Sequence, residues 1–368
     1  MSPHPDTPAR TPPGGLLDLD DDALAEIVGG PSYRVEQVRR WLYGRAVASV
    51  DAMTDLPLGL RARLAEVGVS PLTEVARRSA DDGATLKWLF ESGGSSFETV
   101  LLRYPDRTTV CVSSQAGCAQ GCPFCATGQG GFERQLSTGE ILAQVLVTRR
   151  ELAGLDDGIS PERVSNVVFM GMGEPLANYA NVAAAIQRLC GAVGLSARHV
   201  TVSTIGIPDR IRQMATDLPP VTLAVSLHAP DDELRDRLVP PNRRWPIGDV
   251  LAAVADYRTA GGRRVTFEYT LMEGVNDSAP QARALAALLR PLRPVHVNAI
   301  PMNPTADPAF RPSSPSACRT FVEVLAAEGV NATLRRNRGT SIEAACGQLL
   351  AGRAPLTLRR PNQESGAA

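Results

Sequence analysis

The feature that most limits the fold of this chain is a regular alternation of strand-like and helix-like segments. Apolar runs typical of buried strands lie at residues 108–112, 166–170, 199–202, 222–227, 264–271 and 296–300. Amphipathic stretches typical of helices lie at residues 138–152, 179–190, 207–215, 231–238, 247–260, 278–289 and 316–328. Repeated strand–helix units favour an α/β fold, with a parallel sheet covered by helices. Six such units predict an open, TIM-like (βα)6 barrel.

A small helical accessory domain is predicted ahead of this core, at residues 16–80. Apolar residues recur there at helical spacing in residues 22–28, 34–42 and 60–67. Basic and aromatic residues stand close together in the second of these stretches: Arg34, Arg39, Arg40, Trp41 and Tyr43. Arginine can grip a nucleic-acid backbone and aromatic rings can stack on bases, so this is a candidate RNA-binding domain. The alternative is a solvated basic face, with Trp41 inside the core of the domain.

The remaining segments are expected to be peripheral to the α/β core, which spans residues 105–350. Residues 81–104 predict a β-hairpin extension that turns around residues 92–96. Residues 1–15 are rich in proline, and both they and residues 351–368 predict disordered tails.

Composition limits the functional classes. The 368-residue chain has a net charge of −1, so its overall charge does not indicate nucleic-acid binding. Lys87 is the single lysine, and every other basic side chain is arginine, which suits bidentate phosphate contacts. A codon preference for arginine would give the same pattern. No apolar run is long enough to cross a bilayer and the N-terminus lacks the apolar stretch of a signal peptide, so we expect a cytoplasmic protein with reduced cysteines.

Three cysteines stand within eight residues: Cys118, Cys122 and Cys125. Thiolates at this C-x3-C-x2-C spacing can hold an iron–sulfur cluster, and a four-iron cluster with three protein ligands leaves one iron open. An open iron favours an enzyme over an electron carrier. A structural zinc site needs a fourth protein ligand, and no second Cys or His pair follows nearby. A disulfide framework is typical of short secreted chains and does not suit this one.

The C-x3-C-x2-C run is the signature of the radical S-adenosylmethionine (SAM) superfamily, and this chain resembles it. Further motifs make the chain similar to the RlmN/Cfr family of RNA adenine methyltransferases: VCVSSQ (110–115), GMGEP (171–175), SLH (226–228), PMNP (301–304) and RGTSIEAACGQ (338–348). The likeness runs from about Pro31 to about Gln348. It implies the partial (βα)6 barrel of radical SAM enzymes and a helical N-terminal RNA-binding domain. The motifs fall at or just after predicted strand ends, where βα barrels carry their active sites.

The resemblance implies methylation of C2 of an adenosine in 23S rRNA, at the peptidyl transferase centre, and of an adenosine near the anticodon of tRNAs. Adenine C2 is electron-poor and does not attack SAM as a nucleophile, whereas a carbon radical can add to it. A cofactor must therefore supply radical chemistry. Methylation of adenine C8, the sister reaction of the family, stays open because the same cysteines would serve it. A protein that binds RNA or transfers electrons and merely carries a cluster is disfavoured by the missing fourth ligand.

The resemblance also implies roles for individual residues. The cysteine motif would hold one [4Fe–4S] cluster, and two SAM molecules would be used per turnover. Cys346 would accept a methyl group and carry its carbon to the RNA, and Cys111 would release the product through a transient disulfide with Cys346. Glu98 would be the general base. The residues that would contact SAM are Gly173, Glu174, Ser203, Ser226, Leu227, His228 and Asn303.

Other expectations concern the surroundings of the site and the partners. Nearby arginines are expected to stabilise the Cys346 thiolate: Arg335, Arg336 and Arg338. Cys190 and Cys318 lie in helix-like stretches without a motif, and we expect them to be packing residues. The implied partners are 23S rRNA, tRNA and a reducing electron donor such as flavodoxin. No membrane partner is expected, and we expect a monomer.

Overall fold

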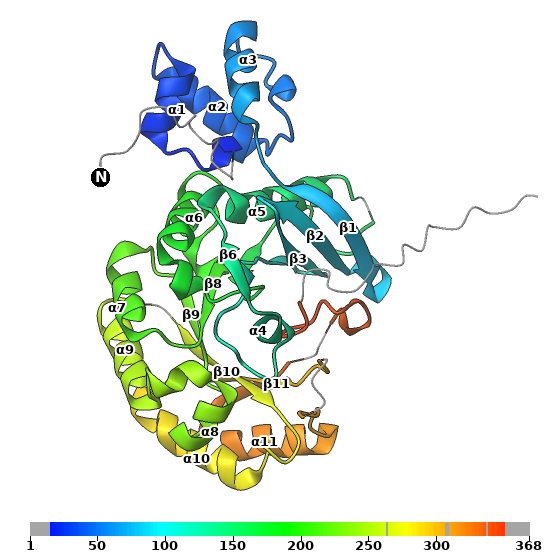
Figure 1. Cartoon of the computed structure of the whole chain (residues 1–368). Coiled ribbons are helices and arrows are strands. Elements are labelled where there is room, and N and C mark those ends of the chain that lie inside the picture. The colour runs from blue at the N-terminus through cyan, green and yellow to red at the C-terminus, as the bar shows by residue number, and fades with distance from the viewer. Residues whose placement is uncertain (1–14, 156, 263, 306–308, 336–337, 350–368) are drawn as a thin grey trace, which may run out of the picture.

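The computed structural model describes residues 15–155, 157–262, 264–305, 309–335 and 338–349. Figure 1 shows a small helical module beside a larger body, in which helices cover the outer side of a curved sheet. Both predicted tails lie outside the described residues, apart from Gly15. Within the ranges that are described, no helix is long and apolar enough to cross a membrane.

The body is built on one ten-stranded sheet whose strands follow the order of the chain. Six parallel strands occupy the segments predicted from the sequence: β4 (Arg107–Cys111), β7 (Asn166–Phe169), β8 (Val200–Thr204), β9 (Thr222–Ser226), β10 (Val265–Leu271) and β11 (His296–Pro301). A seventh, β12 (Asn331–Leu334), pairs with β11 and was not expected, because its short sequence has no apolar run. The sheet order ends at β1 and β12, so the barrel is open. The predicted α/β fold, a partial (βα)6 barrel, is confirmed.

Helices follow the first six parallel strands, as predicted. They are α5 (Thr138–Ala153), α6 (Tyr179–Gly191), α7 (Pro208–Asp217), α8 (Asp232–Leu238), α9 (Ile247–Thr259), α10 (Ala279–Leu289) and α11 (Pro315–Ala327). Their starts are encoded locally. Helix α5 begins with a capping box, in which Ser137 and Glu140 each accept a hydrogen bond from the other's backbone N–H. Proline occupies the first turn of α7, α10 and α11, where its missing N–H costs no helical hydrogen bond.

An antiparallel extension lengthens the sheet beyond β4. Strands β2 (Thr85–Ser92) and β3 (Ser95–Tyr104) form the predicted hairpin, and Gly93 and Gly94 supply the positive φ angles of its turn. Strand β1 (Thr73–Ala80) pairs along β2. Residues 73–80 therefore form a strand and do not continue the helical domain as expected. The error has a physical reason: most of these polar side chains are exposed at the sheet edge, so pairing with β2, and not an apolar pattern, defines the strand.

The N-terminal module contains α1 (Asp21–Val28), α2 (Tyr33–Arg39), a π-helical turn (Arg40–Gly44) and α3 (Leu58–Val67). Polar contacts seat it on the barrel helices. The Arg149 guanidinium on α5 donates to the carbonyl oxygens of Tyr43 and Gly44, at 2.6 and 2.8 Å. The Gly139 N–H, in the first turn of α5, donates to the carboxylate of Asp18. The module is thus fixed at the start and the end of one barrel helix.

Candidate active site

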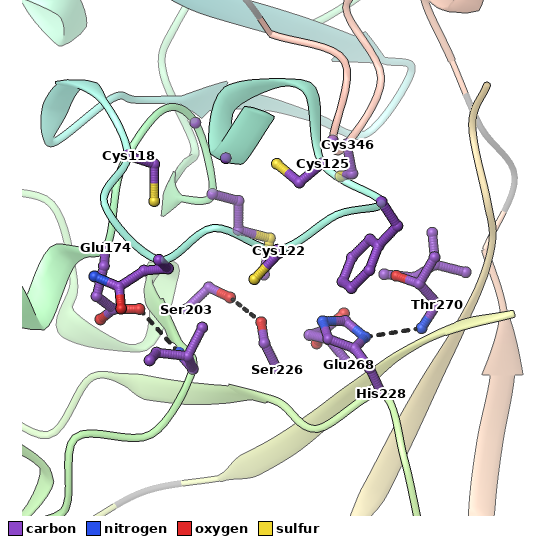
Figure 2. Close-up of a pocket in the computed structure, with 18 of the residues that line it drawn as sticks. Cys118, Cys122, Cys125, Glu174, Ser203, Ser226, His228, Glu268, Thr270 and Cys346 are labelled. Atoms are coloured by element: carbon purple, nitrogen blue, oxygen red, sulfur yellow. Dashed lines mark hydrogen bonds between the residues drawn. The ribbon is translucent and has the colours of Figure 1, made fainter. Parts of the chain in front are cut away.

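A cavity of about 170 Å³ opens at the carboxyl ends of the parallel strands. Figure 2 shows the cysteine loop on one side of it and the loops after β8 and β9 on the other. Most of the residues predicted for the site line this cavity: Cys118, Cys122, Cys125, Gly173, Glu174, Ser203, Ser226, His228, Asn303 and Cys346. Segments more than 200 residues apart in the sequence therefore meet at one place.

The cysteine motif lies on a loop between β5 (Gln115–Gly117) and α4 (Ala126–Gly130). Strand β5 pairs with β6 (Phe132–Gln135), which follows α4, and the Cys118 N–H donates to the Gly131 carbonyl at 2.8 Å. The loop is thus closed at its base, and its cysteines are free thiols in this structure.

The cysteine loop fits an iron–sulfur cluster in its chemistry. Burial raises the pKa of Cys118 to about 12 and that of Cys122 well above its usual value. A bound cation must therefore stabilise the thiolate forms that act as ligands. In the part of the chain that is described, no three His, Cys, Asp or Glu side chains converge closely enough to hold a single metal ion. Cysteines that surround a cavity without converging suit a multi-iron cluster, because each thiolate binds a different iron.

Gln115 fixes the loop after β7 against the cysteine loop. Its side-chain oxygen accepts a hydrogen bond from the Glu174 N–H at 2.8 Å. Gly173 has a φ of +99°, and a Cβ there would lie 2.5 Å from the Gln115 side chain, so glycine is required. The buried Glu174 carboxylate accepts from the Thr204 hydroxyl at 2.7 Å and from the Ile205 N–H at 2.9 Å. Burial nevertheless raises the pKa of Glu174 to about 7.

The loops after β8 and β9 present hydroxyl groups and an imidazole to the cavity. The hydroxyl oxygens of Ser203 and Ser226 lie 3.4 Å apart. The Nδ1 atom of His228 accepts a hydrogen bond from the Thr270 N–H at 3.0 Å (Figure 2). Burial and a neighbouring arginine lower the pKa of His228 to about 3, so the ring is neutral and carries its proton on Nε2. The ring of Phe124, in the cysteine loop, meets the imidazole edge-on at 4.9 Å.

Leu227 differs from its neighbours because it is fully buried and does not line the cavity. Its carbonyl accepts from the guanidinium of Arg235 on α8, at 3.1 Å, and its N–H donates to the Glu268 carbonyl. Arg235 also donates to the carbonyls of Ile205 and Ser226, so it braces two loops of the cavity. Burial lowers the pKa of Arg235 to about 10. Its sequence context, DELRDRL, is that of a surface helix, so sequence reasoning missed it.

The segment at residues 339–349 returns to the cavity and carries Cys346, whose side chain is exposed. Its backbone is held from both sides. The Asn303 side-chain amide donates to the Cys346 carbonyl at 3.0 Å, and the Ala126 N–H donates to the Gly347 carbonyl at 2.8 Å. Asn303, predicted as a SAM contact, therefore also positions the cysteine.

A second cavity, of about 260 Å³, adjoins the first, because Met170, Ile300, Arg335 and Cys346 line both. Cys111 of β4 lines the second cavity and is 9% exposed. Burial, with Cys346 adding to it, raises the pKa of Cys111 to about 12. The structure thus brings Cys111 and Cys346 to the wall of one cavity as free thiols.

The arginines expected near Cys346 have different surroundings. Arg335 lies 3.7 Å from the carboxylate of Glu268, a buried residue of β10 that the sequence did not single out and whose pKa is raised by burial. Arg338 lines the second cavity and stacks on the ring of Tyr104, at 4.2 Å. Arg336 lies outside the described residues.

Glu98 lies on β3 and is 5% exposed. It is not among the residues that line either cavity, although Val100 and Leu102, on the same face of β3, line the second. One carboxylate oxygen of Glu98 is 2.8 Å from the ammonium nitrogen of Lys87. Lys87 in turn donates to the Glu343 carbonyl at 3.1 Å. Glu98 thus lies beside the cavities, in contact with a lysine that also holds the Cys346 segment.

The two aromatic residues singled out in the N-terminal module, Trp41 and Tyr43, lie in its core. Trp41 and Tyr43 are 8% and 4% exposed, and the indole N–H of Trp41 donates to the Asp55 carboxylate. The sequence alternative with Trp41 inside the core therefore applies, and these rings do not form a stacking surface. The remaining cysteines pack against the apolar core, Cys190 on α6 and Cys318 on α11.

Residues 112–284 match the radical SAM superfamily, and residues 15–69 match the ribosomal RNA large subunit methyltransferase N-terminal domain. The chain is 52% identical over 358 residues to a probable dual-specificity RNA methyltransferase RlmN of Parafrankia sp. (strain EAN1pec), covering 92% of each chain. It is 49% identical to a protein of the same name from Mycolicibacterium vanbaalenii, covering 94% of this chain and 97% of that relative. A solved structure, of a radical SAM methyltransferase from Sphaerobacter thermophilus, matches with a TM-score of 0.86 and 46% identity, covering 92% of this chain and 99% of that chain.

These likenesses extend over the helical module and the barrel together. They confirm the prediction of an enzyme, and membership of the superfamily implies a 4Fe–4S cluster and SAM as cofactors. The chain belongs to the RlmN family of dual-specificity radical SAM RNA methyltransferases.

Proposed function

We propose that the protein methylates C2 of an adenosine in 23S rRNA, at the peptidyl transferase centre, and C2 of an adenosine near the anticodon of tRNAs. The relatives are probable dual-specificity RNA methyltransferases, which supports two classes of RNA substrate. The observation that carries the proposal is the position of Cys346, which lines both the cavity of the cysteine motif and the cavity of Cys111. A carrier cysteine needs access to a methyl donor on one side and to a resolving thiol on the other.

One [4Fe–4S] cluster would be held by Cys118, Cys122 and Cys125, and together with SAM it supplies the one-electron chemistry that removes a hydrogen atom from an S-methyl group. Two SAM molecules serve each turnover. The residues that would bind SAM are Gly173, Glu174, Ser203, Ser226, Leu227, His228 and Asn303. Among them, the neutral His228 offers an Nε2–H donor, and Ser203 and Ser226 offer adjacent hydroxyl groups.

Cys346 is the methyl acceptor in this proposal. Its sulfur would form a bond to the methyl carbon of one SAM while the bond from that carbon to the sulfonium breaks and S-adenosylhomocysteine leaves. The thiol proton goes to solvent, to which the side chain is exposed. After the S-methyl group has lost a hydrogen atom, its carbon forms a bond to adenine C2 and joins the RNA to the protein. The hydrogen bonds from Asn303 and Ala126 hold the backbone of this segment during both steps.

Cys111 and Glu98 release the product. Addition of the carbon radical leaves an unpaired electron on the adenine ring, and this electron would pass to the oxidised cluster as the one-electron acceptor. Glu98 takes the proton from C2, and the Cys111 thiolate then forms an S–S bond to Cys346 while the bond from sulfur to the methylene carbon breaks. The methylene carbon keeps the electron pair and takes up a proton to complete the methyl group. Burial disfavours the Cys111 thiolate, and the positive charge of Arg335, which acts on both cysteines, favours it. The other proposed partner is an electron donor such as flavodoxin, which restores the reduced cluster and the free thiols. We propose that the protein acts as a monomer.

The test is product analysis with reconstituted protein, reductant, SAM and each class of RNA, under anaerobic conditions. We expect 2-methyladenosine in 23S rRNA and in tRNA, with 5′-deoxyadenosine as the SAM product. An 8-methyladenosine product would replace the C2 assignment by the sister reaction. Absence of any methylated adenosine with an intact cluster would overturn the proposal.

A further inference from the structure

Lys87 is the single lysine among 38 lysine and arginine residues, and it is buried. Its side chain is 7% exposed, as is that of its partner Glu98. A buried ammonium is costly unless it is paired and its protons are hydrogen-bonded. A chain that uses arginine everywhere else therefore keeps a lysine at a position where surface solubility cannot be the reason.

The geometry explains why this position holds an ammonium. Lys87 on β2 and Glu98 on β3 are diagonal neighbours on one face of the hairpin, because Lys87 pairs with Val100 and Leu89 pairs with Glu98. The same nitrogen lies 2.8 Å from the Glu98 carboxylate and 3.1 Å from the Glu343 carbonyl. An ammonium directs donors to two acceptors from one atom. A guanidinium spreads its donors over three nitrogens in a plane and is larger.

The two acceptors belong to the two parts that must act together. Glu98 is the base assigned under the proposed function, and its carbonyl also accepts a hydrogen bond from the Ser113 hydroxyl, between β4 and β5. Glu343 stands three residues before Cys346, in a left-handed backbone conformation with a φ of +55°. One ammonium therefore connects the side chain of the base to the segment that presents the carrier cysteine.

We propose that Lys87 is a positioning residue that holds the Glu98 carboxylate in register with the Cys346 segment, so that Glu98 reaches the adenine proton once the RNA is joined to Cys346. This inference rests on the proposed function. Lys87 therefore acts in release of the product. Methylation of Cys346 does not depend on Lys87, because that step needs no base at this position.

The test is a comparison of Lys87→Arg with Glu98→Gln in the full-length, reconstituted protein. Mass spectrometry would measure three quantities: S-methylation of Cys346, the covalent protein–RNA adduct and released methylated RNA. For Lys87→Arg we expect normal iron content and S-methylation, accumulation of the adduct, and release slowed about ten-fold because the base is misplaced. When Lys87→Arg is added to Glu98→Gln, release of the RNA should slow by less than about two-fold relative to Glu98→Gln alone. Both substitutions act through the Glu98 carboxylate, so their effects should not add.

Arg78→Met is the matched control, because Arg78 pairs with Lys87 across β1 and β2 and lies 3.8 Å from the Glu343 carboxylate, but at the surface. It should release product at the wild-type rate. A further variant, Lys87→Met, removes the ammonium and leaves the buried Glu98 carboxylate without this partner, which can prevent folding. The double variant Lys87→Met/Glu98→Gln removes that negative charge as well, and it should behave as Glu98→Gln alone.

The outcomes separate this inference from the proposed function. Adduct accumulation in Glu98→Gln but wild-type release in Lys87→Arg would overturn the positioning role alone. Equal loss of S-methylation and adduct in Lys87→Arg would also overturn it, because Lys87 would then support the fold of the Cys346 segment. Wild-type release in Glu98→Gln would overturn the assigned base and, with it, the foundation of this inference.

Discussion

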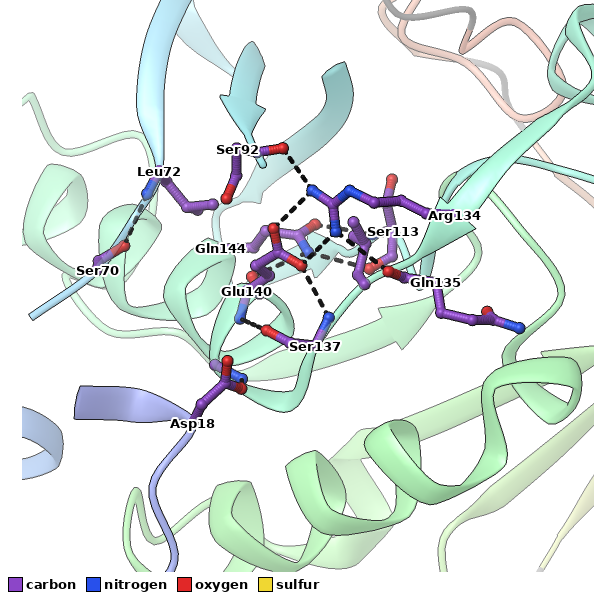
Figure 3. Close-up of polar contacts among 12 residues, drawn as sticks. Asp18, Ser70, Leu72, Ser92, Ser113, Arg134, Gln135, Ser137, Glu140 and Gln144 are labelled. Atoms are coloured by element: carbon purple, nitrogen blue, oxygen red, sulfur yellow. Dashed lines mark hydrogen bonds and ion pairs between the residues drawn. The ribbon is translucent and has the colours of Figure 1, made fainter. Parts of the chain in front are cut away.

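Replacing Arg134 by methionine tests how the cysteine loop is anchored. Arg134 lies on β6, which follows α4 and pairs with β5 at the base of the cysteine loop. Its guanidinium forms two 2.8 Å hydrogen bonds to the Glu140 carboxylate at the start of α5 (Figure 3). It also donates to the Ser92 carbonyl at the end of β2. The Glu140 side chain is fully buried and the Arg134 side chain is 25% exposed. One guanidinium thus joins the loop, the hairpin and a barrel helix.

The magnitude follows from the charge that the substitution leaves behind. Removing one partner of a buried ion pair costs about 3–5 kcal/mol, and the partial exposure of Arg134 places the cost near the lower end, about 3 kcal/mol. The unfolding entropy of a chain of this length is about 0.8 kcal/mol per kelvin, so we expect the unfolding temperature to fall by about 4 °C. Arg212→Met removes the exposed pair with Asp256 and is the control, with an expected loss of less than about 1 kcal/mol. Scanning calorimetry at one scan rate measures both.

The pKa of Glu140 determines how the stability contributed by this ion pair changes with pH. Burial alone would raise the pKa of Glu140, but hydrogen bonds from Arg134 and from neighbouring groups outweigh it and lower the pKa. The stabilisation is therefore present above the unfolded pKa of a carboxyl group and is lost only in acid. In Arg134→Met the largest opposing hydrogen bonds are lost, so burial raises the pKa of the carboxyl group relative to wild type and the penalty falls as the pH is lowered. The stability difference between Arg134→Met and wild type should therefore shrink from pH 8 to pH 5. A difference that stays constant or grows over this range would refute this reasoning, and so would a variant as stable as wild type at pH 8. We also expect a lower iron content, because the loop loses its anchor.

The remaining predictions concern single residues of the site. Cys346→Ala should abolish methylation, whereas Cys111→Ala should accumulate protein joined to RNA; free unmodified RNA from Cys111→Ala, seen by gel shift under denaturing conditions, would contradict its role in release. Cys190→Ala should leave turnover within two-fold of wild type, because this thiol packs on the outer helix α6, and a large loss with intact folding would reveal a function for it. Gly173→Ala should weaken SAM binding at least ten-fold in calorimetry, because its Cβ would overlap the Gln115 side chain at a φ of +99° and force strain of about 1–3 kcal/mol into the loop. Unchanged SAM affinity would show that this loop does not shape the SAM site.

The parallel strands and their helices could be predicted because each is defined by its own side chains. The six strands are rich in β-branched and apolar residues, and the helices carry an apolar stripe. The elements missed are those whose pairing defines them: β1 at the exposed edge, β12 at the other end, and the small β5–β6 sheet that closes the cysteine loop. None of these has a pattern of its own, so only the tertiary partner makes them strands.

The site divides in the same way. The cysteine motif and the GMGEP and SLH sequences are local patterns, and the structure gathers their cavity-facing residues at one set of strand ends. The residues that hold them are far away in sequence and chemically ordinary: Gln115 under Gly173, and Arg235 under the SLH loop. Their roles depend on which backbone groups fold against them, and a single sequence carries no signal of that.

The open edge of the barrel gives the Cys346 segment its place. A closed eight-stranded barrel fills its interior with side chains, and no further segment can enter it. Here the parallel strands end at β12, and residues 339–349 continue past that end to the antiparallel extension. There the Gly339 N–H donates to the Asp81 carboxylate, between β1 and β2, and the Lys87 ammonium donates to the Glu343 carbonyl. The chain thereby reaches the side of the barrel on which β4 carries Cys111, and a cavity of about 260 Å³ is left between them. The antiparallel extension is thus more than an added sheet edge, because it holds the segment that brings the exposed thiol of Cys346 and the buried thiol of Cys111 to one cavity. It follows that a change in the hairpin that leaves the cluster loop intact should uncouple release of the RNA from the earlier steps.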